Sequence, residues 1–249
     1  MSKIDDLCLV VNTVSHCMDL WEMFFKQLEK HFPNNKTYVF SDVIEGLPEN
    51  VTPIKYDIND NFRTQYLGCI KQVEEKFCIY FNEDYILYGD VNVDRIKEYV
   101  DFMEEDESIS FIKINKNENS LGVKYKERDD LIYLNPNLQH FFSQAVAIWR
   151  TRTLEEIHEL GPDLHIANLR TGLQFETEAN AVCQKMGLQG LYSYNGEPKR
   201  GIYHYDNNIF PYIATAIIKG VWNLKEYNNE LFPLFIKYGI NPTIRGNNK

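Results

Sequence analysis

The sequence lacks the glycine-rich motifs that mark several enzyme classes. The first apolar run, Leu7 to Val11, continues into Asn-Thr-Val-Ser without a glycine, so neither a phosphate loop nor a GxGxxG turn follows it. The GxSxG turn of α/β-hydrolases is absent too. These absences exclude a Rossmann dehydrogenase and a hydrolase of that kind. They also rank a nucleotidyltransferase low, because that class normally has a glycine-rich phosphate loop after its first strand.

Positive charge and paired cysteines are scarce. Asp and Glu number 36 against 26 Lys and Arg, which gives a formal net charge of −10. Nucleic-acid binding depends on clustered Lys and Arg, so this balance argues against a nucleic-acid partner. The five cysteines are odd in number and contain no CxxC pair. This pattern argues against a zinc site or a disulfide framework and favours a reducing compartment.

Apolar runs of membrane-spanning length are missing as well. The longest candidate, Ile213 to Val221, is interrupted by Lys219, whereas a spanning helix needs about 20 apolar residues. The six residues before Leu7 carry no apolar segment of the kind found in secretory signals. We therefore expect a cytoplasmic protein with no transmembrane segment.

The apolar runs that are present predict an α/β fold. Leu7 to Val11 is typical of a strand buried on both faces of a parallel sheet. Met18 to His31 has apolar residues at helical spacing, and Lys36 to Phe40 is a second strand. Strand, helix and strand in this order form a βαβ unit. The chain shows no repeat and no linker-like segment, which indicates one domain.

The rest of the chain continues this alternation. We expect strands at 54–58, 77–81 and 108–114, and helices at 62–76, 93–103, 153–160, 175–186, 212–221 and 229–238. The polar segment 116–130 predicts a surface loop or hairpin. The segment 190–208, rich in Gly, Tyr and charged residues, predicts an active-site loop.

Polar residues follow three predicted strands where each strand ends. They are Asn12 to Ser15, Asp42, and the acidic turn Asn82-Glu83-Asp84. Ligands of open α/β sheets bind outside the carboxyl ends of the strands, so these clusters predict a binding site. A pair of carboxylates there is suited to hold a divalent cation. Ordinary solvated acids at a strand end are the alternative interpretation.

The segment Tyr80 to Leu87 resembles the variant DxD motif of GT-A glycosyltransferases, in which an x-Glu-Asp turn follows a buried strand. Five further segments are similar to small bacterial and viral sugar transferases of polysaccharide biosynthesis, namely 143–150, 175–178, 201–206, 219–223 and 245–246. The resemblance covers most of the chain. It implies a GT-A-like, Rossmann-related fold with a mostly parallel central sheet flanked by helices, in a single domain. Residues 1–92 would form its nucleotide-binding half and residues 93–249 its acceptor-binding half.

The resemblance also implies a set of residues that bind the nucleotide sugar. The residues that follow the first strand, Asn12, Thr13 and Ser15, would line the nucleotide pocket, and Asp42 would bind the base or ribose. The basic side chains would face the diphosphate or the sugar. The set is Asn12, Thr13, Ser15, Asp42, Arg63, Asn82, Glu83, Asp84, Lys199 and Arg200. A surface position is the alternative for Arg63, and a solvated basic pair is the alternative for Lys199 and Arg200.

A divalent cation, Mn²⁺ or Mg²⁺, is the cofactor that the resemblance implies. Asp84 would hold it, with Glu83 in support and His204 as a further ligand. For His204, a contact to the diphosphate and a structural or surface position are the alternatives. Position 82 departs from the usual motif, because it is Asn instead of Asp. The cation would therefore depend chiefly on Asp84.

The catalytic base is expected in the segment Phe175 to Glu178. An inverting transferase needs one carboxylate that deprotonates the acceptor hydroxyl. Glu176 and Glu178 are the candidates, and on a helix they point in different directions. Glu176 is favoured because it follows apolar Phe175, and partial burial would raise its pKa. Acids that stabilise the start of a helix are the alternative interpretation.

The function implied is transfer of a sugar from a nucleotide-diphosphate sugar to a glycan or glycolipid acceptor. The pair Glu176 and Glu178 favours inversion, and retention without a dedicated base is the alternative outcome. UDP is the commonest carrier for this fold. The competing hypothesis is a non-catalytic nucleotide- or glycan-binding domain with the same fold, and Asn82 favours it. The sequence predicts no oligomeric state.

Overall fold

The computed structural model describes residues 4–116, 122–160, 171–201 and 204–247. One large sheet contains β1 (Leu7–Asn12), β2 (Thr37–Ser41), β3 (Thr52–Lys55), β4 (Phe77–Asn82), β6 (Ile109–Lys113), β7 (Lys124–Tyr125), β8 (Arg128–Leu134), β9 (Ala147–Arg150) and β10 (Gln189–Ser193). Short strands pair outside it: β5 (Ile86–Leu87) with β13 (Tyr212–Ile213), β11 (Lys199–Arg200) with β12 (His204–Tyr205), and β14 (Ile217–Ile218) with β15 (Val221–Trp222). The helices are η1 (Ser15–Cys17), α1 (Met18–His31), α2 (Phe62–Ile70), α3 (Val93–Glu105), α4 (Thr151–Leu160), α5 (Thr171–Met186) and α6 (Leu224–Tyr238).

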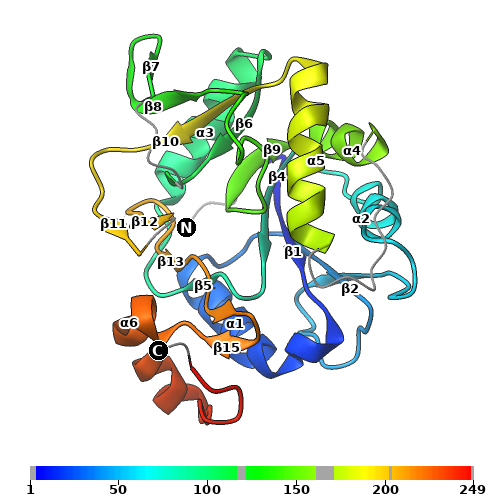
Figure 1. Ribbon diagram of the computed structural model, residues 1–249, viewed down its shortest axis with the longest axis vertical. Coiled ribbons are helices and arrows are strands. Elements are labelled where there is room, and N and C mark those ends of the chain that lie inside the picture. The colour runs from blue at the N-terminus through cyan, green and yellow to red at the C-terminus, as the bar shows by residue number, and fades with distance from the viewer. Residues whose placement is uncertain (1–3, 117–121, 161–170, 202–203, 248–249) are drawn as a thin grey trace.

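The central sheet has nine strands in the order β3-β2-β1-β4-β9-β6-β10-β8-β7 (Figure 1). Strands β3, β2, β1, β4, β6 and β10 run parallel, whereas β9 and β8 run against them. The expected α/β class, with a mostly parallel central sheet flanked by helices, is confirmed. Both halves of the chain contribute strands to this one sheet, since β4 pairs with β9.

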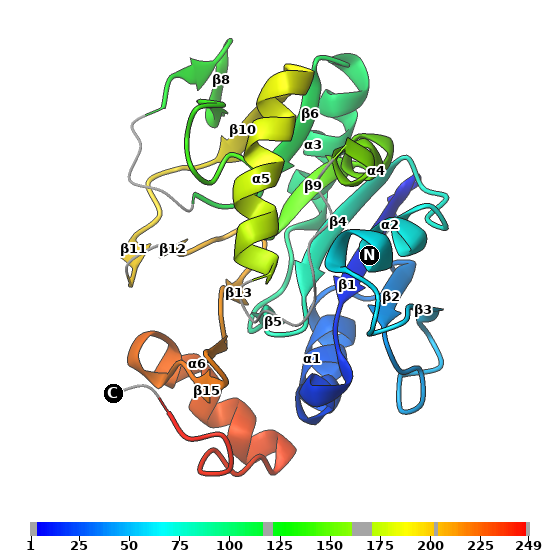
Figure 2. The same cartoon turned by 45° about the vertical axis from the view of Figure 1, so that its right-hand side comes forward.

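Two hydrophobic cores cover the two faces of the sheet, which explains the continuous apolar strands. Leu9 and Val11 of β1 pack in the core formed with α1, α3 and α6. Cys8 and Val10 point to the opposite face and pack in the core formed with α2, α4 and α5. Figure 2 shows α2, α4 and α5 together in front of the sheet. Because successive strand residues alternate between faces, a strand covered on both sides is apolar along most of its length.

The last helix joins the molecule through α1. Tyr238 Oη of α6 donates to Gln27 Oε1 at 2.9 Å, and Gln27 Nε2 donates to the Leu87 carbonyl at 2.8 Å. The same amide side chain therefore connects α6 to β5, the short strand just after the acidic turn. Further along, Arg245 pairs with Asp19 at the start of α1.

Two segments differ from the sequence-based prediction. The predicted helix at 212–221 is wrong: this segment forms β13, β14 and the start of β15. Lys219 and Gly220 both have positive φ, 52° and 82°, and they make the turn between β14 and β15. The predicted loop at 190–208 begins instead with β10 inside the sheet. Glycine is required at position 190, because a Cβ there would lie 2.1 Å from Cζ of Phe111.

Several boundaries also move. Helix α2 ends at Ile70, where the strongly polar segment that follows offers little to bury, instead of at residue 76. Helix α5 starts at Thr171, so Glu176 and Glu178 lie inside the helix and not at its start. Within the part of the chain that the structure describes, no helix combines the length and apolar character needed to cross a membrane.

Candidate functional site

The carboxyl ends of β1, β2 and β4 lie side by side. Asn12 of β1 is the register partner of both Phe40 of β2 and Asn82 of β4. Asp42 directly follows β2, and the acidic turn directly follows β4. The structure therefore brings the three polar clusters of the sequence to one edge of the sheet. This edge is where ligands bind in open α/β folds.

On the β1 side of this edge, Asp42 is fixed by Ser15. Its Oδ1 accepts from the Ser15 backbone N–H at 2.7 Å, and its Oδ2 accepts from Ser15 Oγ at 2.7 Å. Thr13 is buried and binds its neighbours, since its Oγ1 accepts from Trp21 Nε1 and its carbonyl accepts from Tyr56 Oη, both at 2.8 Å. These bonds hold the loops after β1 and β2 as one unit.

The two carboxyl groups of the acidic turn have different surroundings. Glu83 is only 8% exposed and faces Thr13 and Cys17, on the side of η1. Burial raises the pKa of Glu83, and hydrogen bonds from Cys17 and Thr13 oppose that rise. Glu83 thus supports the loop after β1.

Asp84 is a carboxyl group without a fixed counter-charge. Its backbone carbonyl accepts from the Ala216 N–H at 3.0 Å, in the segment between β13 and β14. Burial first, and the neighbouring Glu83 carboxyl second, raise the pKa of Asp84 well above its ordinary value. Among the described residues, Asp84 forms no ion pair with Lys, Arg or His. A cation bound there would offset the unfavourable burial of this charge.

A divalent cation at Asp84 would have few ligands from the protein. The described residues contain no group of three or more His, Cys, Asp or Glu side chains able to hold a metal ion. Most ligands of a cation at Asp84 would therefore come from the diphosphate and from water, as is usual for Mg²⁺. His204 lies in β12 opposite Arg200, and its buried Nδ1 has no hydrogen-bond partner among the described residues. Burial lowers the pKa of His204, and the Glu226 carboxylate opposes that shift. Its role as a metal ligand stays a prediction.

A hydrogen-bonded chain connects the acidic turn to α5. Asn82 Nδ2 lies 3.4 Å from Gln144 Oε1, a long contact, and the Gln144 N–H donates to Glu176 Oε1 at 2.6 Å. Tyr80 Oη also approaches Asn82 Oδ1, at 3.5 Å. Asn82 and Glu176, which are 94 positions apart in the chain, are thus joined by one intervening residue.

Burial raises the pKa of Glu176, while the Gln144 amide and the positive charge of Lys113 oppose that rise. Phe175, the preceding residue, is fully buried and its ring stacks on His158 at 4.6 Å between centroids, which fixes this turn of α5. Glu176 is half-buried. Burial makes this carboxylate more basic, and the nearby cation limits that effect, so Glu176 is suited to accept a proton.

Glu178 has a different environment from Glu176. Its Oε2 is buried and has no hydrogen-bond partner among the described residues. Two positions along an α-helix correspond to a rotation of about 200°, so the two carboxylates leave α5 in nearly opposite directions. Only Glu176 contacts the chain that leads to the acidic turn.

Two residues of this site were missed in the sequence. Gln144 and Lys113 are polar residues inside apolar segments, and that interruption is the signal that could have identified them. Lys113 is fully buried in β6, pairs in register with Ala147, and donates to the His140 carbonyl. Buried ammonium groups need such partners, so Lys113 belongs to the arrangement around Glu176.

Two of the cations expected at the diphosphate bind other groups. Arg63 donates from Nε to the His158 carbonyl at 2.6 Å and from Nη2 to the Glu159 carbonyl at 2.7 Å, at the last turn of α4. Arg200 donates to Asp206 at 2.6 Å and pairs with Glu230 at 2.9 Å. In the structure these guanidinium groups are directed at protein groups, and phosphate binding by them stays a prediction.

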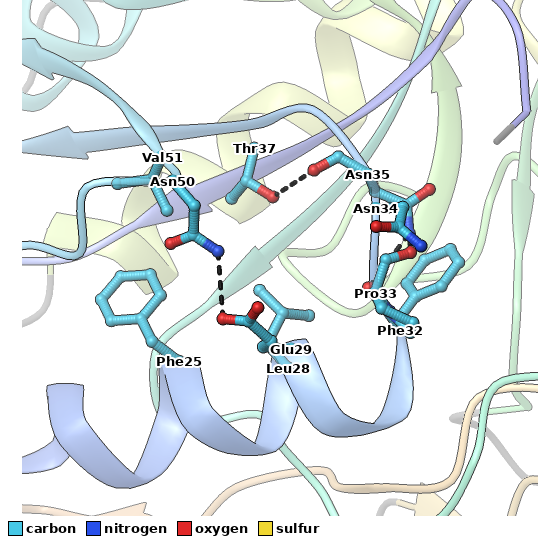
Figure 3. A pocket seen from close by; sticks show the side chains of 10 residues that line it. All are labelled: Phe25, Leu28, Glu29, Phe32, Pro33, Asn34, Asn35, Thr37, Asn50 and Val51. Atoms are coloured by element: carbon cyan, nitrogen blue, oxygen red, sulfur yellow. Dashed lines mark hydrogen bonds between the residues drawn. The ribbon is translucent and has the colours of Figure 1, made fainter.

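A small cavity lies away from this edge (Figure 3). It is formed between the end of α1 and the start of β2, and its lining includes Phe25, Glu29, Thr37 and Asn50. Asn50 Nδ2 donates to Glu29 Oε2 across it at 3.1 Å. Its volume of about 40 Å³ is enough for a few waters but not for a nucleotide sugar. It also adjoins the amino end of β2, whereas ligands bind at the carboxyl ends.

No protein-family model matches this chain, and no curated protein sequence matches it. The fold is similar to that of solved structures. TarS from S. aureus, residues 1–349, aligns over 93% of this chain and 64% of its own, with 13% identity and a TM-score of 0.48. The same fragment in complex with UDP-GlcNAc aligns over 80% of this chain and 60% of its own, with 15% identity and a TM-score of 0.48.

A third similar structure is the mannosyltransferase PcManGT from Pyrobaculum calidifontis in complex with GDP-Man and Mn²⁺. It aligns over 79% of this chain and 58% of its own, with 12% identity and a TM-score of 0.47. This chain spans less than two thirds of the length of each of these three structures.

Proposed function

We propose that this protein is a cytoplasmic glycosyltransferase that moves a sugar from a nucleotide-diphosphate sugar, a UDP-sugar first of all, to a hydroxyl group of a glycan or glycolipid acceptor. The observation that carries the proposal is the chain from Asn82 through Gln144 to Glu176. It joins the acidic turn to a half-buried carboxylate at the edge of the sheet where ligands bind.

The donor would bind across the carboxyl ends of β1, β2 and β4. Asn12, Thr13 and Ser15 lie beside the nucleotide, and Asp42, held by Ser15, accepts hydrogen bonds from the base or ribose. The diphosphate lies next to Asp84. Asp84 would hold a divalent cation there, and the positive charge of that cation would stabilise the leaving diphosphate.

Glu176 acts as the general base. Its carboxylate accepts the proton of the acceptor hydroxyl while the hydroxyl oxygen forms a bond to the anomeric carbon of the sugar. The bond between that carbon and the diphosphate oxygen breaks, and the diphosphate leaves with the electron pair. Attack and departure occur on opposite faces of the sugar, so the product has inverted stereochemistry.

Donor binding is tested by thermal shift with UDP, in the presence and absence of Mn²⁺. Binding to the folded state raises the melting temperature by mass action. We expect UDP with Mn²⁺ to stabilise the wild type, and Asp84→Asn to lose the Mn²⁺-dependent part of the shift. If the Mn²⁺-dependent shift is unchanged in Asp84→Asn, the cation does not bind at this residue.

Turnover is tested by release of UDP from UDP-sugars in the presence of Mn²⁺. Glu176→Gln keeps the size of the side chain and the ability to form hydrogen bonds but cannot accept the proton, so we expect a loss of about 100-fold or more in kcat. The UDP thermal shift should persist in this variant. Glu178→Gln is the matched comparison, because it removes the same charge two residues away. If Glu178→Gln loses kcat and Glu176→Gln does not, Glu178 is the general base instead of Glu176.

The second candidate function is a binding domain without catalysis. The presence of Asn82 in place of Asp and the orientation of Glu83 toward Thr13 and Cys17 favour it, because they leave Asp84 as the principal acidic group for a cation. Saturable binding of nucleotide sugars with no turnover of any common donor would support this function over the first.

A further inference from the structure

A buried lysine lies at the same edge of the sheet, beyond the groups used above. Lys116 follows the carboxyl end of β6, and Tyr194 follows the carboxyl end of β10, the parallel neighbour of β6. Lys116 is only 7% exposed. Its Nζ lies 4.6 Å from the centre of the Tyr194 ring and 4.9 Å from the centre of the Tyr205 ring.

The two tyrosine rings form a cage around the ammonium group. Their centroids are 5.5 Å apart and their planes meet at 79°, so each ring contacts Lys116 from a different side. Tyr205 belongs to β12 and is the register partner of Lys199 in β11. The cage is therefore closed by the β11–β12 hairpin, which also brings a second ammonium group toward Lys116.

Within the described residues, the protein supplies no negative charge that balances the ammonium group of Lys116. Among the described residues, no carboxylate pairs with Lys116 and no group accepts a hydrogen bond from its Nζ. Burial, and then the positive charge of Lys199, lower the pKa of Lys116. Cation–π contacts recover part of the lost hydration, but they supply no negative charge.

An open hollow adjoins Lys199. It has a volume of about 410 Å³ and is lined by Lys199, Arg200, Gly201, Asp206, Lys225 and Glu226. The side chain of Glu226 packs on Gly201, where a Cβ would lie 2.1 Å from Glu226 Oε1, so the floor of the hollow is closely packed. The hollow gives a phosphate-bearing molecule access to this side of the hairpin.

We propose that Lys116 and Lys199 form a binding site for a phosphate group, with Tyr194 and Tyr205 fixing the position of Lys116. Two like charges close together in a protein of net charge −10 are a local arrangement that an anion stabilises. Three N–H donors of Lys116 are available for the phosphate oxygens. The phosphate belongs either to the acceptor or to the diphosphate of the donor, and the experiment distinguishes these sources.

The probe is inorganic phosphate, titrated against the full chain and followed by thermal shift at constant ionic strength with chloride. We expect a saturable shift in the wild type. Lys116→Gln and Lys199→Gln should each weaken phosphate binding by about tenfold or more, since a charge-assisted hydrogen bond is lost. Lys116→Arg should retain most of the binding. Lys97→Gln, which removes the same charge from the exposed face of α3, is the matched control.

A parallel titration with UDP identifies the source. Weaker phosphate binding in Lys116→Gln with unchanged UDP affinity assigns the site to an acceptor phosphate. An equal loss of both assigns it to the donor diphosphate. The proposal is overturned if the wild type shows no saturable phosphate response, or if the Lys116 and Lys199 variants behave like Lys97→Gln. Lys199 is largely exposed, so its variant gives a result even if Lys116→Gln fails to fold. The phosphate titration needs no turnover, so its outcome is independent of the proposed transferase activity.

Discussion

The carboxylate of Asp42 accepts two hydrogen bonds from Ser15, one from the backbone N–H and one from the hydroxyl, each 2.7 Å long. Ser15 begins η1, directly after the loop that follows β1, and Asp42 directly follows β2. The pair therefore holds together two of the three loops at the ligand-binding edge. These two hydrogen bonds fix the position of Asp42 before a ligand binds, which lowers the entropic cost of binding.

Ser15→Ala tests this preorganisation. It removes one of the two hydrogen bonds, worth about 1 kcal/mol, so we expect UDP to bind about fivefold more weakly. Isothermal titration with UDP measures the effect. Thr243→Ala is the control, because its hydroxyl also donates a 2.7 Å hydrogen bond, to Asn241, far along the chain. Equal UDP affinity in both variants would show that the Ser15 hydroxyl does not order the site.

Asp84→Asn should make the metal-free protein more stable at neutral pH. The folded state raises the pKa of Asp84, so it favours the protonated form. Such a group stabilises the fold at low pH, and that contribution is lost as pH rises from the ordinary value of 3.8 toward the raised value. As pH rises, Asp84 acquires a buried negative charge, whereas an asparagine stays neutral. The unfolding free energy of Asp84→Asn, relative to that of the wild type, should therefore increase with pH.

Urea unfolding in chelator, at several values between about pH 4 and pH 7, measures this difference. Asp101→Asn is the control, because Asp101 is an exposed residue paired with Lys97. A constant difference between Asp84→Asn and the wild type across this range would show that Asp84 is not held in an unfavourable charged state.

Lys113→Met tests the cation beside Glu176. The positive charge of Lys113 opposes the rise in the pKa of Glu176, so its removal should raise that pKa further. The base is then protonated up to a higher pH, and the acidic limb of the kcat/KM profile should move to higher pH. We also expect a stability loss of about 1–3 kcal/mol, because the His140 carbonyl loses its donor. A profile that falls in height without moving would indicate a purely structural role.

Arg63→Met separates structure from phosphate binding. Arg63 donates two hydrogen bonds to the carbonyl groups at the end of α4, and their loss should lower the unfolding free energy by about 3 kcal/mol. The affinity for UDP should not change. Arg152→Met, on the exposed side of the same helix, is the control. A strong loss of UDP affinity with normal stability would instead support the role in diphosphate binding that the sequence predicts for Arg63.

The parts of the fold that could be predicted from the sequence are those whose conformation depends on the pattern of neighbouring residues in the chain. The run Leu7 to Val11 is apolar throughout because both of its faces are covered, and the periodicity of Met18 to His31 reflects one covered face. The sequence also predicts that the polar loops lie together, because the carboxyl ends of parallel strands meet at one edge of the sheet. The segment 212–221 was predicted wrongly because its apolar residues fit a helix equally well, whereas pairing with β5 and the turn at Gly220 decide its conformation.

The contacts of the candidate site could not be predicted in the same way. The bond between Gln144 and Glu176 joins a segment beside β9 to the middle of α5, and only tertiary packing determines which residues of the two elements meet. The different surroundings of Glu83 and Asp84 depend on Cys17 and on the segment after β13. Arg63 looked available in sequence because the carbonyl groups it binds belong to a helix 95 residues later.

The bond from the Ala216 N–H to the Asp84 carbonyl has a consequence for how the protein is made. A ribosome synthesises residues 1–92 long before it reaches β13 and β14, yet β5 has no partner strand until β13 exists. The acidic turn therefore acquires its final shape late in synthesis. A fragment that ends at residue 210 contains every expected donor-binding residue, but it lacks the segment whose Ala216 N–H binds the Asp84 carbonyl.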